Sequence, residues 1–138
     1  MASPFEGYQI RSVIIADESQ ASSGNLYFEV QKQLLAYQPD AVFSCAEEVT
    51  DAVVNCIGHY EPLKGMYVIG HGNPKDYLNH LENGTINGVV TQNDSYAASL
   101  GVRFLAQLSS GSYMPQDVDS GITIITPSNM ERFFAVEE

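Results

Sequence analysis

Short apolar runs alternate with amphipathic stretches along the whole chain. The runs are rich in Val, Ile, Tyr and Phe, and most are followed by a polar loop, which is typical of strands buried inside a sheet. The sequence predicts five such strands, at Ile10–Ala16, Ala41–Cys45, Met66–Ile69, Gly88–Thr91 and Ile122–Ile125.

The stretches between these runs have helical periodicity. Leu26, Val30 and Leu34 are four residues apart, a spacing that places them on one face of a helix. Asparagines precede two of the later stretches, where an N-cap accepts a backbone N–H. Helices are predicted after a cap at Ser22, Ser23 or Gly24, from about Thr50 to His59, from Asn73 and after Asn93.

Repeated alternation of strands and helices predicts an α/β protein. The expected architecture is a three-layer α/β/α sandwich with a mostly parallel, five-stranded sheet. A chain of 138 residues is long enough for one such core and too short for two ordinary domains. We therefore expect a lead-in at residues 1–9, a single lobe at residues 10–129 and a C-terminal tail at residues 130–138.

The charge of the chain narrows the range of partners. Its formal net charge is −11, and no segment concentrates Lys or Arg. Phosphate backbones and anionic membrane surfaces both require a basic patch, so we expect no direct contact with nucleic acid. No apolar run approaches the roughly 20 residues that span a bilayer, so we expect no membrane insertion.

Polar residues follow the predicted strands at positions where a ligand would bind. In parallel sheets, ligands meet the loops at the carboxyl ends of the strands. His71, Gly72 and Asn73 follow one predicted strand, and Gln92 follows another. These residues are candidate ligand contacts. The alternative is that Gly70–Gly72 only forms a turn and that Gln92 is an ordinary loop residue.

Other motifs do not favour catalysis. Glu47 and Glu48 could form an acid/base pair, but the helix dipole alone favours acidic residues at the start of a helix. The histidines lack the spacing of a helical metal site, no Ser or Cys has a nucleophile-elbow context, and Gly70-His71-Gly72 lacks the third glycine of a dinucleotide fingerprint. We expect no catalytic residue, no metal and no cofactor.

Five segments match a known family in their order and spacing. They are Gln33-Leu-Leu-Ala-Tyr-Gln-Pro-Asp-Ala-Val-Phe-Ser, Tyr67-Val-Ile-Gly-His-Gly-Asn-Pro, Leu81-Glu-Asn-Gly-Thr-Ile-Asn-Gly-Val-Val-Thr-Gln, Leu100-Gly-Val-Arg-Phe-Leu and Asp119-Ser-Gly-Ile-Thr-Ile-Ile-Thr-Pro-Ser-Asn. Across most of its length the chain resembles the C-terminal lobe of type I periplasmic-binding-protein-like domains. That group includes ribose-type sugar-binding proteins and the effector domains of lactose-repressor-type regulators.

The resemblance assigns roles to individual residues. It implies that Gln92 is the glutamine that hydrogen-bonds the sugar in the cleft between two lobes. Glu47 takes the acidic position of the family's Asn-Asp pair, with Ala46 in place of the asparagine, and Gly72 stands where the family usually has an aspartate. The candidate ligand-binding residues are Gln92, His71, Gly72, Asn73, Glu47 and Ser22.

The resemblance also implies partners. The family's two-lobe chain has an N-terminal lobe, and its C-terminal lobe opens with one more strand and helix before the region resembling Ile10–Ala16. We therefore expect a small-molecule ligand, a sugar, and either the missing N-terminal lobe or a second copy of the chain as partner. A homo-oligomer is expected to form at an open sheet edge, either as a symmetric dimer or by an exchange of N-terminal segments, for which residues 1–16 are the expected segment.

Two non-enzymatic functions follow from the resemblance. The first is the ligand-binding lobe of a solute-binding protein in a bacterial ABC-type uptake system, which would be periplasmic or extracellular and lipid-anchored. The alternative is the effector-binding and dimerisation lobe of a sugar-responsive, lactose-repressor-type transcription regulator, which would be cytoplasmic. An α/β enzyme is the third possibility.

Overall fold

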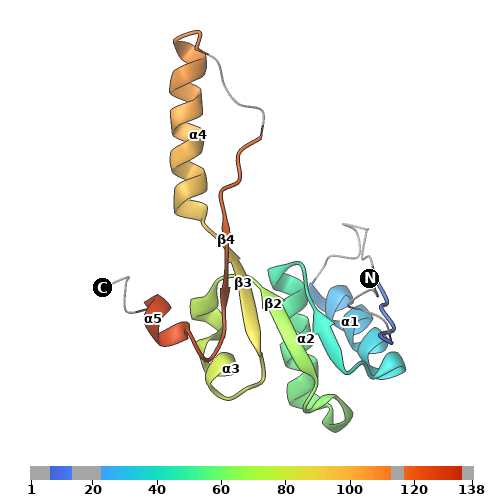
Figure 1. Ribbon diagram of the computed structural model, residues 1–138. Helices are drawn as coiled ribbons and strands as arrows, with labels where there is room; N and C mark the ends of the chain where they lie inside the picture. Colours follow the sequence, from blue (N-terminus) through green and yellow to red (C-terminus); the bar gives the residue numbers. More distant parts are fainter. Residues whose placement is uncertain (1–6, 14–22, 113–116, 135–138) are drawn as a thin grey trace.

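The computed structural model of the chain describes residues 7–13, 23–112 and 117–134 (Figure 1). Within these ranges, helices and strands alternate as predicted. The elements are α1 Ser23–Tyr37, β1 Ala41–Phe43, α2 Glu47–His59, the 3-10 helix η1 Glu61–Leu63, β2 Tyr67–His71, the 3-10 helix η2 Pro74–Tyr77, α3 Leu78–Glu82, β3 Gly88–Gln92, α4 Asp94–Ser109, β4 Ile122–Ile125 and α5 Met130–Phe134.

The strands form one sheet in the order β1-β2-β3-β4. β1, β2 and β3 are parallel, and β4 is antiparallel to β3. The parallel strands are joined by α2 and by the η2–α3 segment, as parallel neighbours require. The predicted α/β fold with a mostly parallel sheet is therefore confirmed, with four strands in the described residues.

The predicted first strand is wrong for the residues that the structure describes. Ile10–Val13 belongs to none of the four strands, and residues 14–16 lie outside the described ranges. Ile10 is 76% exposed, and Arg11 lies over the ring of Tyr37, 3.6 Å from its centroid. An apolar run becomes a strand only where a neighbour completes its hydrogen bonds, and none of the described strands pairs with this segment.

One face of the sheet is covered by helices. Val68, Val89 and Ile125 project from it and are almost fully buried. Helix α2 and the η2–α3 segment pack on this face, and α1 packs on α2. The buried cluster also contains Val30, Leu34, Ala52, Val53, Cys56, Ile57, Leu63, Met66, Tyr77, Leu81 and Ile86.

The opposite face of the sheet is bare in the described residues. Phe43, Tyr67 and Ile122 alternate with the buried residues along their strands, and they are 61%, 66% and 67% exposed. Figure 1 shows α4 standing off the end of the sheet, with residues 117–121 beside it. The second helical layer predicted from the sequence is therefore not packed on this face among the residues that the structure describes.

The predicted helix starts are largely confirmed. Asn73 and Asn93 cap η2 and α4, because their side-chain oxygens accept the N–H groups of Lys75 and Tyr96. α2 begins at Glu47, earlier than predicted, and its acidic first turn suits the positive end of the helix dipole. Within the described ranges, no helix is long and apolar enough to span a membrane.

Part of the predicted C-terminal tail is helical. Residues Met130–Phe134 form α5, and Met130 and Phe133 pack against the core. The hydrogen bond from the N–H of Met130 to the carbonyl of Thr126 ties the start of α5 to the end of β4. Residues 130–134 are therefore held beside the sheet.

Candidate ligand-binding site

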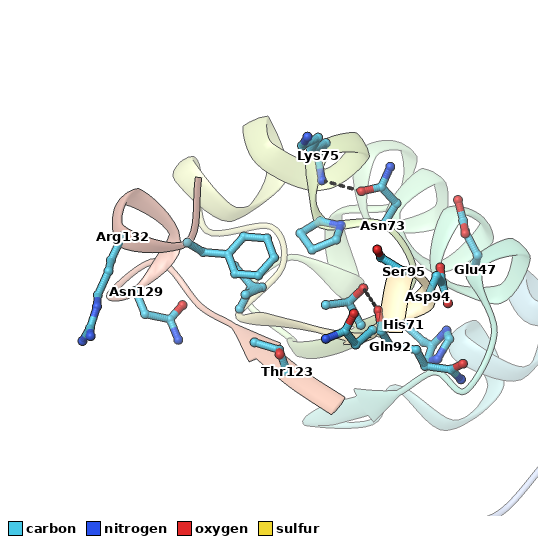
Figure 2. A pocket seen from close by; sticks show the side chains of 16 residues that line it. Glu47, His71, Asn73, Lys75, Gln92, Asp94, Ser95, Thr123, Asn129 and Arg132 are labelled. Atoms are coloured by element: carbon cyan, nitrogen blue, oxygen red, sulfur yellow. Dashed lines mark hydrogen bonds between the residues drawn. The ribbon is translucent and has the colours of Figure 1, made fainter. Parts of the chain in front are cut away.

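A cleft of about 790 Å³ lies at the carboxyl ends of β2 and β3 and extends along β4 to α5 (Figure 2). Amides, hydroxyls, charged groups of both signs and one aromatic ring line it. The lining residues are Glu47, His71, Gly72, Asn73, Pro74, Lys75, Thr91, Gln92, Asn93, Asp94, Ser95, Thr123, Ile125, Asn129, Arg132 and Phe133.

The structure brings the predicted site residues together. Glu47, His71, Gly72, Asn73 and Gln92 all line this cleft, so their predicted placement at one edge of the sheet is confirmed. Their contact with a ligand stays a prediction. Ser22, the remaining candidate, lies outside the described residues.

His71 and Gln92 leave the same face of the sheet. His71 pairs with Val90, and Gln92 lies two residues further along β3. The two residues are therefore about 7 Å apart along the strands and about 5 Å apart across them. Neither side chain, nor the carboxylate of Glu47, bonds to another described residue. Their donors and acceptors are available to a ligand.

Thr50 on α2 holds the backbone of His71 in place. β1 ends at Phe43, so the N–H of His71 has no strand partner on that side, and it donates to the Thr50 hydroxyl at 3.0 Å. The same hydroxyl lies 2.9 Å from the carbonyl oxygen of His71 and 2.8 Å from the Ser44 hydroxyl. Thr50 and Ser44 are both buried. This network ties the end of β2 to the first turns of α2.

Gly72 shapes the floor of the cleft. Its φ of +145° lies in a region that side chains rarely adopt, and a Cβ there would approach Glu47 and Tyr77 to 3.0 Å. A glycine is required because both the backbone conformation and the space exclude a side chain. Gly72 thus brings the peptide chain close to whatever occupies the cleft.

Tyr77 supports the site from below. Its hydroxyl donates to the carboxylate of Asp51 at 2.8 Å and lies 3.3 Å from the carbonyl oxygen of Glu47. Burial is the main reason that the pKa of Tyr77 is raised above its ordinary value of 10.0, and the neighbouring Asp51 and Glu47 add to the effect. Tyr77 therefore stays neutral at physiological pH and links η2 to α2.

Tyr77→Phe is expected to reduce the loss of stability at alkaline pH. Above pH 10 the unfolded chain loses a phenolic proton that the folded chain keeps, because the folded pKa is raised. The contribution of Tyr77 is therefore complete below about pH 10 and falls above it, by at most about 1.4 kcal/mol per pH unit. Urea unfolding at about pH 9 and about pH 11 measures this difference. The exposed Tyr8→Phe is the matched control. An alkaline loss in Tyr77→Phe as large as in the unchanged chain would contradict the prediction.

The C-terminal part of the cleft was not predicted from the sequence. Thr123 lies near the start of β4, and because β4 is antiparallel, its start rather than its end meets the ligand edge. Asn129 is fixed by the backbone: its amide donates to the carbonyl of Ile124 at 2.9 Å and accepts the N–H of Thr126 at 2.7 Å. The turn signal at Pro127-Ser128-Asn129 could have predicted that the chain folds back here.

Acidic and basic side chains both reach the cleft. Glu47 and Asp94 lie toward one end, and Asn129 and Arg132 lie at the other (Figure 2). No group of three or more His, Cys, Asp or Glu side chains that could hold a metal ion occurs in the ranges that the structure describes. The arrangement suits a polar organic ligand.

Comparison with known proteins supports the fold. No family model and no curated protein sequence matches the chain significantly. The glucose–galactose-binding protein GanP from Geobacillus stearothermophilus matches with a TM-score of 0.70 at 17% identity, over 82% of this chain and 41% of that protein. A solute-binding protein from Agrobacterium vitis, bound to α-D-tagatopyranose, matches with a TM-score of 0.73 at 16% identity. The match covers 83% of this chain and 39% of that protein. A carbohydrate-transporter solute-binding protein from Agrobacterium radiobacter, in complex with D-arabinose, matches with a TM-score of 0.69 at 22% identity. The match covers 84% of this chain and 40% of that protein.

These matches show what the fold is. The chain has the fold of one part of sugar-binding solute-binding proteins of ABC transporters, and it spans about two fifths of the length of the proteins it matches. The resemblance to a single lobe of a type I periplasmic-binding-protein-like domain is thereby confirmed at the level of fold.

Proposed function

We propose that the chain is the sugar-binding lobe of a solute-binding protein from a bacterial ABC-type uptake system. One observation carries the proposal: Gln92, His71 and Glu47 meet in one cleft with side chains that have no partner among the described residues. Sugar hydroxyls both donate and accept hydrogen bonds, and an amide, an imidazole and a carboxylate offer matching groups.

The lining of the cleft favours a neutral, hydroxyl-rich ligand. Lys75 and Arg132 balance Glu47 and Asp94, although the chain as a whole is strongly acidic. The remaining polar groups are amides and hydroxyls, and the half-buried Phe133 offers an apolar surface for the C–H groups of a ring. In this proposal Gln92 both donates to and accepts from hydroxyls.

The cleft is proposed to bind its ligand without changing it. No Ser or Thr hydroxyl bonds to the imidazole of His71 in the described residues, so no hydroxyl is activated there as a nucleophile. The matched structures from Geobacillus stearothermophilus and Agrobacterium radiobacter are of binding proteins. We therefore infer a non-enzymatic role.

A second surface is needed for tight binding. Small-ligand sites usually bury most of the ligand, whereas this cleft covers one side. An N-terminal lobe would close over the other side by a hinge movement. The working place of such a protein is the periplasm or the outer surface of the cell. The domain division, with residues 10–129 as the lobe, belongs to the same proposal, and the packing of Met130 and Phe133 against the core extends that lobe into α5.

NMR titration of the isotope-labelled chain with D-glucose, D-galactose, D-arabinose and D-tagatose tests the function. We expect weak binding, with dissociation constants of about 1 mM or more, because a single lobe supplies about half of the contacts. The shifted signals should belong to residues that line the cleft. Gln92→Ala should weaken binding at least about tenfold, since it removes an amide that bonds hydroxyls.

The exposed Gln9→Ala, which lies outside the cleft, is the matched control and should leave binding unchanged. Absence of shifts with every sugar, or shifts that Gln92→Ala does not alter, would contradict the proposed function. Micromolar affinity for a monosaccharide would contradict the inference that a second lobe is needed.

A further inference from the structure

The bare face of the sheet is an apolar surface without a cover in the described residues. We call it the open face, and it consists of Ala41, Phe43, Tyr67, Ile69, Val90, Ile122 and Ile124, with the polar His71 and Gln92 on the same face at its ligand edge. Apolar patches of this kind on soluble proteins usually mark an interface. The open face has no charged side chain.

Helix α4 carries a second uncovered apolar surface. Ala98, Gly101, Val102, Leu105 and Leu108 lie on one side of the helix, where each has a neighbour three or four residues away, and all are exposed. Val102 and Leu105 are 70% and 67% exposed. This ridge also lacks charge. The buried apolar side of α4 is a different one, which contains Leu100.

The ridge and the open face of one chain do not meet. Asn93 alone separates β3 from α4, and its side chain fixes the turn by accepting the N–H of Tyr96 at 3.0 Å. α4 therefore continues beyond the sheet and leaves its own open face uncovered (Figure 1). The surface that fits the ridge must come from elsewhere.

A second copy of the chain offers a surface of matching charge and size. The net charge of −11 makes two copies repel at most of their surfaces, but contact between ridge and open face brings no carboxylates together. The ridge runs from Ala98 to Leu108 and is about 16 Å long, and a five-residue strand is about 17 Å long, so the ridge matches the strands in length.

We infer that two copies of the chain form a twofold dimer in which each α4 lies on the open face of the other copy. The exchange is reciprocal, so the contact occurs twice. If each large apolar side chain of the two surfaces gives up roughly 100 Å², the dimer buries on the order of 1,600 Å², the size of a standard stable interface. The structure thus assigns the exchange to α4 rather than to residues 1–16.

Light scattering at several concentrations of the chain measures the association. We expect the mass to rise from 15.1 kDa toward twice that value as the concentration increases. Leu105→Lys on the ridge and Tyr67→Glu on the open face should each weaken association at least about 100-fold, because each places an unpaired charge in both contacts.

Mixing Leu105→Lys with Tyr67→Glu tests whether α4 of one copy contacts the open face of the other. In a mixed dimer, Lys at position 105 of one copy faces Glu at position 67 of the other, and the second contact consists of unchanged surfaces. The mixture should therefore dimerise although neither variant does so alone. Val102→Lys and Ile122→Glu repeat the test at second positions in case one of the first variants does not fold, which circular dichroism reports.

Ser99→Lys, on α4 but off the ridge, and Tyr8→Glu, in an exposed segment outside both surfaces, are matched controls and should leave the mass unchanged. A mass of about 15 kDa at every concentration would overturn the inference. So would a dimer that survives Leu105→Lys and Tyr67→Glu, or a mixture of these variants that stays monomeric.

Discussion

Gly70→Ala is expected to lower the free energy of unfolding by about 3 kcal/mol. A Cβ at this position would lie 2.5 Å from the γ-methyl group of Thr50, far inside van der Waals contact. Thr50 is fully buried and its hydroxyl is held by the backbone of His71, so it cannot rotate away without losing these bonds. Urea unfolding of the variant and the unchanged chain measures the difference.

Thr50→Ser provides the control for this clash. Serine keeps the hydroxyl and removes the γ-methyl group, after which the closest remaining contacts of the new Cβ are at 3.3 Å and 3.6 Å. Gly70→Ala combined with Thr50→Ser should therefore be little less stable than Thr50→Ser alone. Strictly additive losses in this double-mutant cycle would show that the γ-methyl group is not the cause.

Thr50→Val is expected to cost about 2 to 3 kcal/mol, although valine has nearly the same shape as threonine. The loss arises because the half-buried N–H of His71 would keep no acceptor, and the Ser44 hydroxyl would lose its nearest partner. The end of β2 should open more often, so the amide proton of His71 should exchange faster with solvent. Thr50→Ser should retain slow exchange.

The measurement for this prediction is a urea titration together with amide hydrogen exchange. If the free energy of unfolding falls but exchange at His71 stays slow, the hydroxyl contributes to stability without holding the cleft. If both stay unchanged, another group accepts the His71 N–H and the assigned role of Thr50 is wrong.

Local signals in the sequence predicted most of the fold. Four predicted strands occur in the sheet, because each is an apolar run that finds a parallel or antiparallel neighbour. Asn73 and Asn93 cap the helices as predicted, since capping depends on a few adjacent residues. The segment Ile10–Val13 has the same apolar character, yet no described strand pairs with it. Strand formation depends on a distant partner, which periodicity along one segment does not reveal.

The position of α4 could not be predicted either. Its apolar residues indicate a buried helix, and Leu100 is buried, but Leu105 and Leu108 face solvent in the chain on its own. The pattern predicts a helix whose apolar side packs against another surface, but it does not identify that surface. The pattern of apolar residues along one chain does not show whether a helix packs against its own chain or against a second chain.

The rule that ligands bind at the carboxyl ends of parallel strands predicted only one part of the cleft. It placed Glu47, His71 and Gln92 at one edge, where the structure has them. It did not find Thr123 or Asn129, because the antiparallel direction of β4 and the return of the chain through α5 are tertiary features. Thr50 was missed because its role is to bind backbone groups of β2, and no motif marks that role.

The short connection between β3 and α4 has a thermodynamic consequence. Asp94 and Ser95 belong to the first turn of α4 and also to the wall of the cleft, so the direction of the helix and the shape of the wall are set by the same few peptide units. If a second copy holds α4 in one orientation, occupancy of the cleft and self-association become linked equilibria. If dimerisation changes the affinity for the ligand by a certain factor, then ligand binding must change the affinity between the two copies by the same factor.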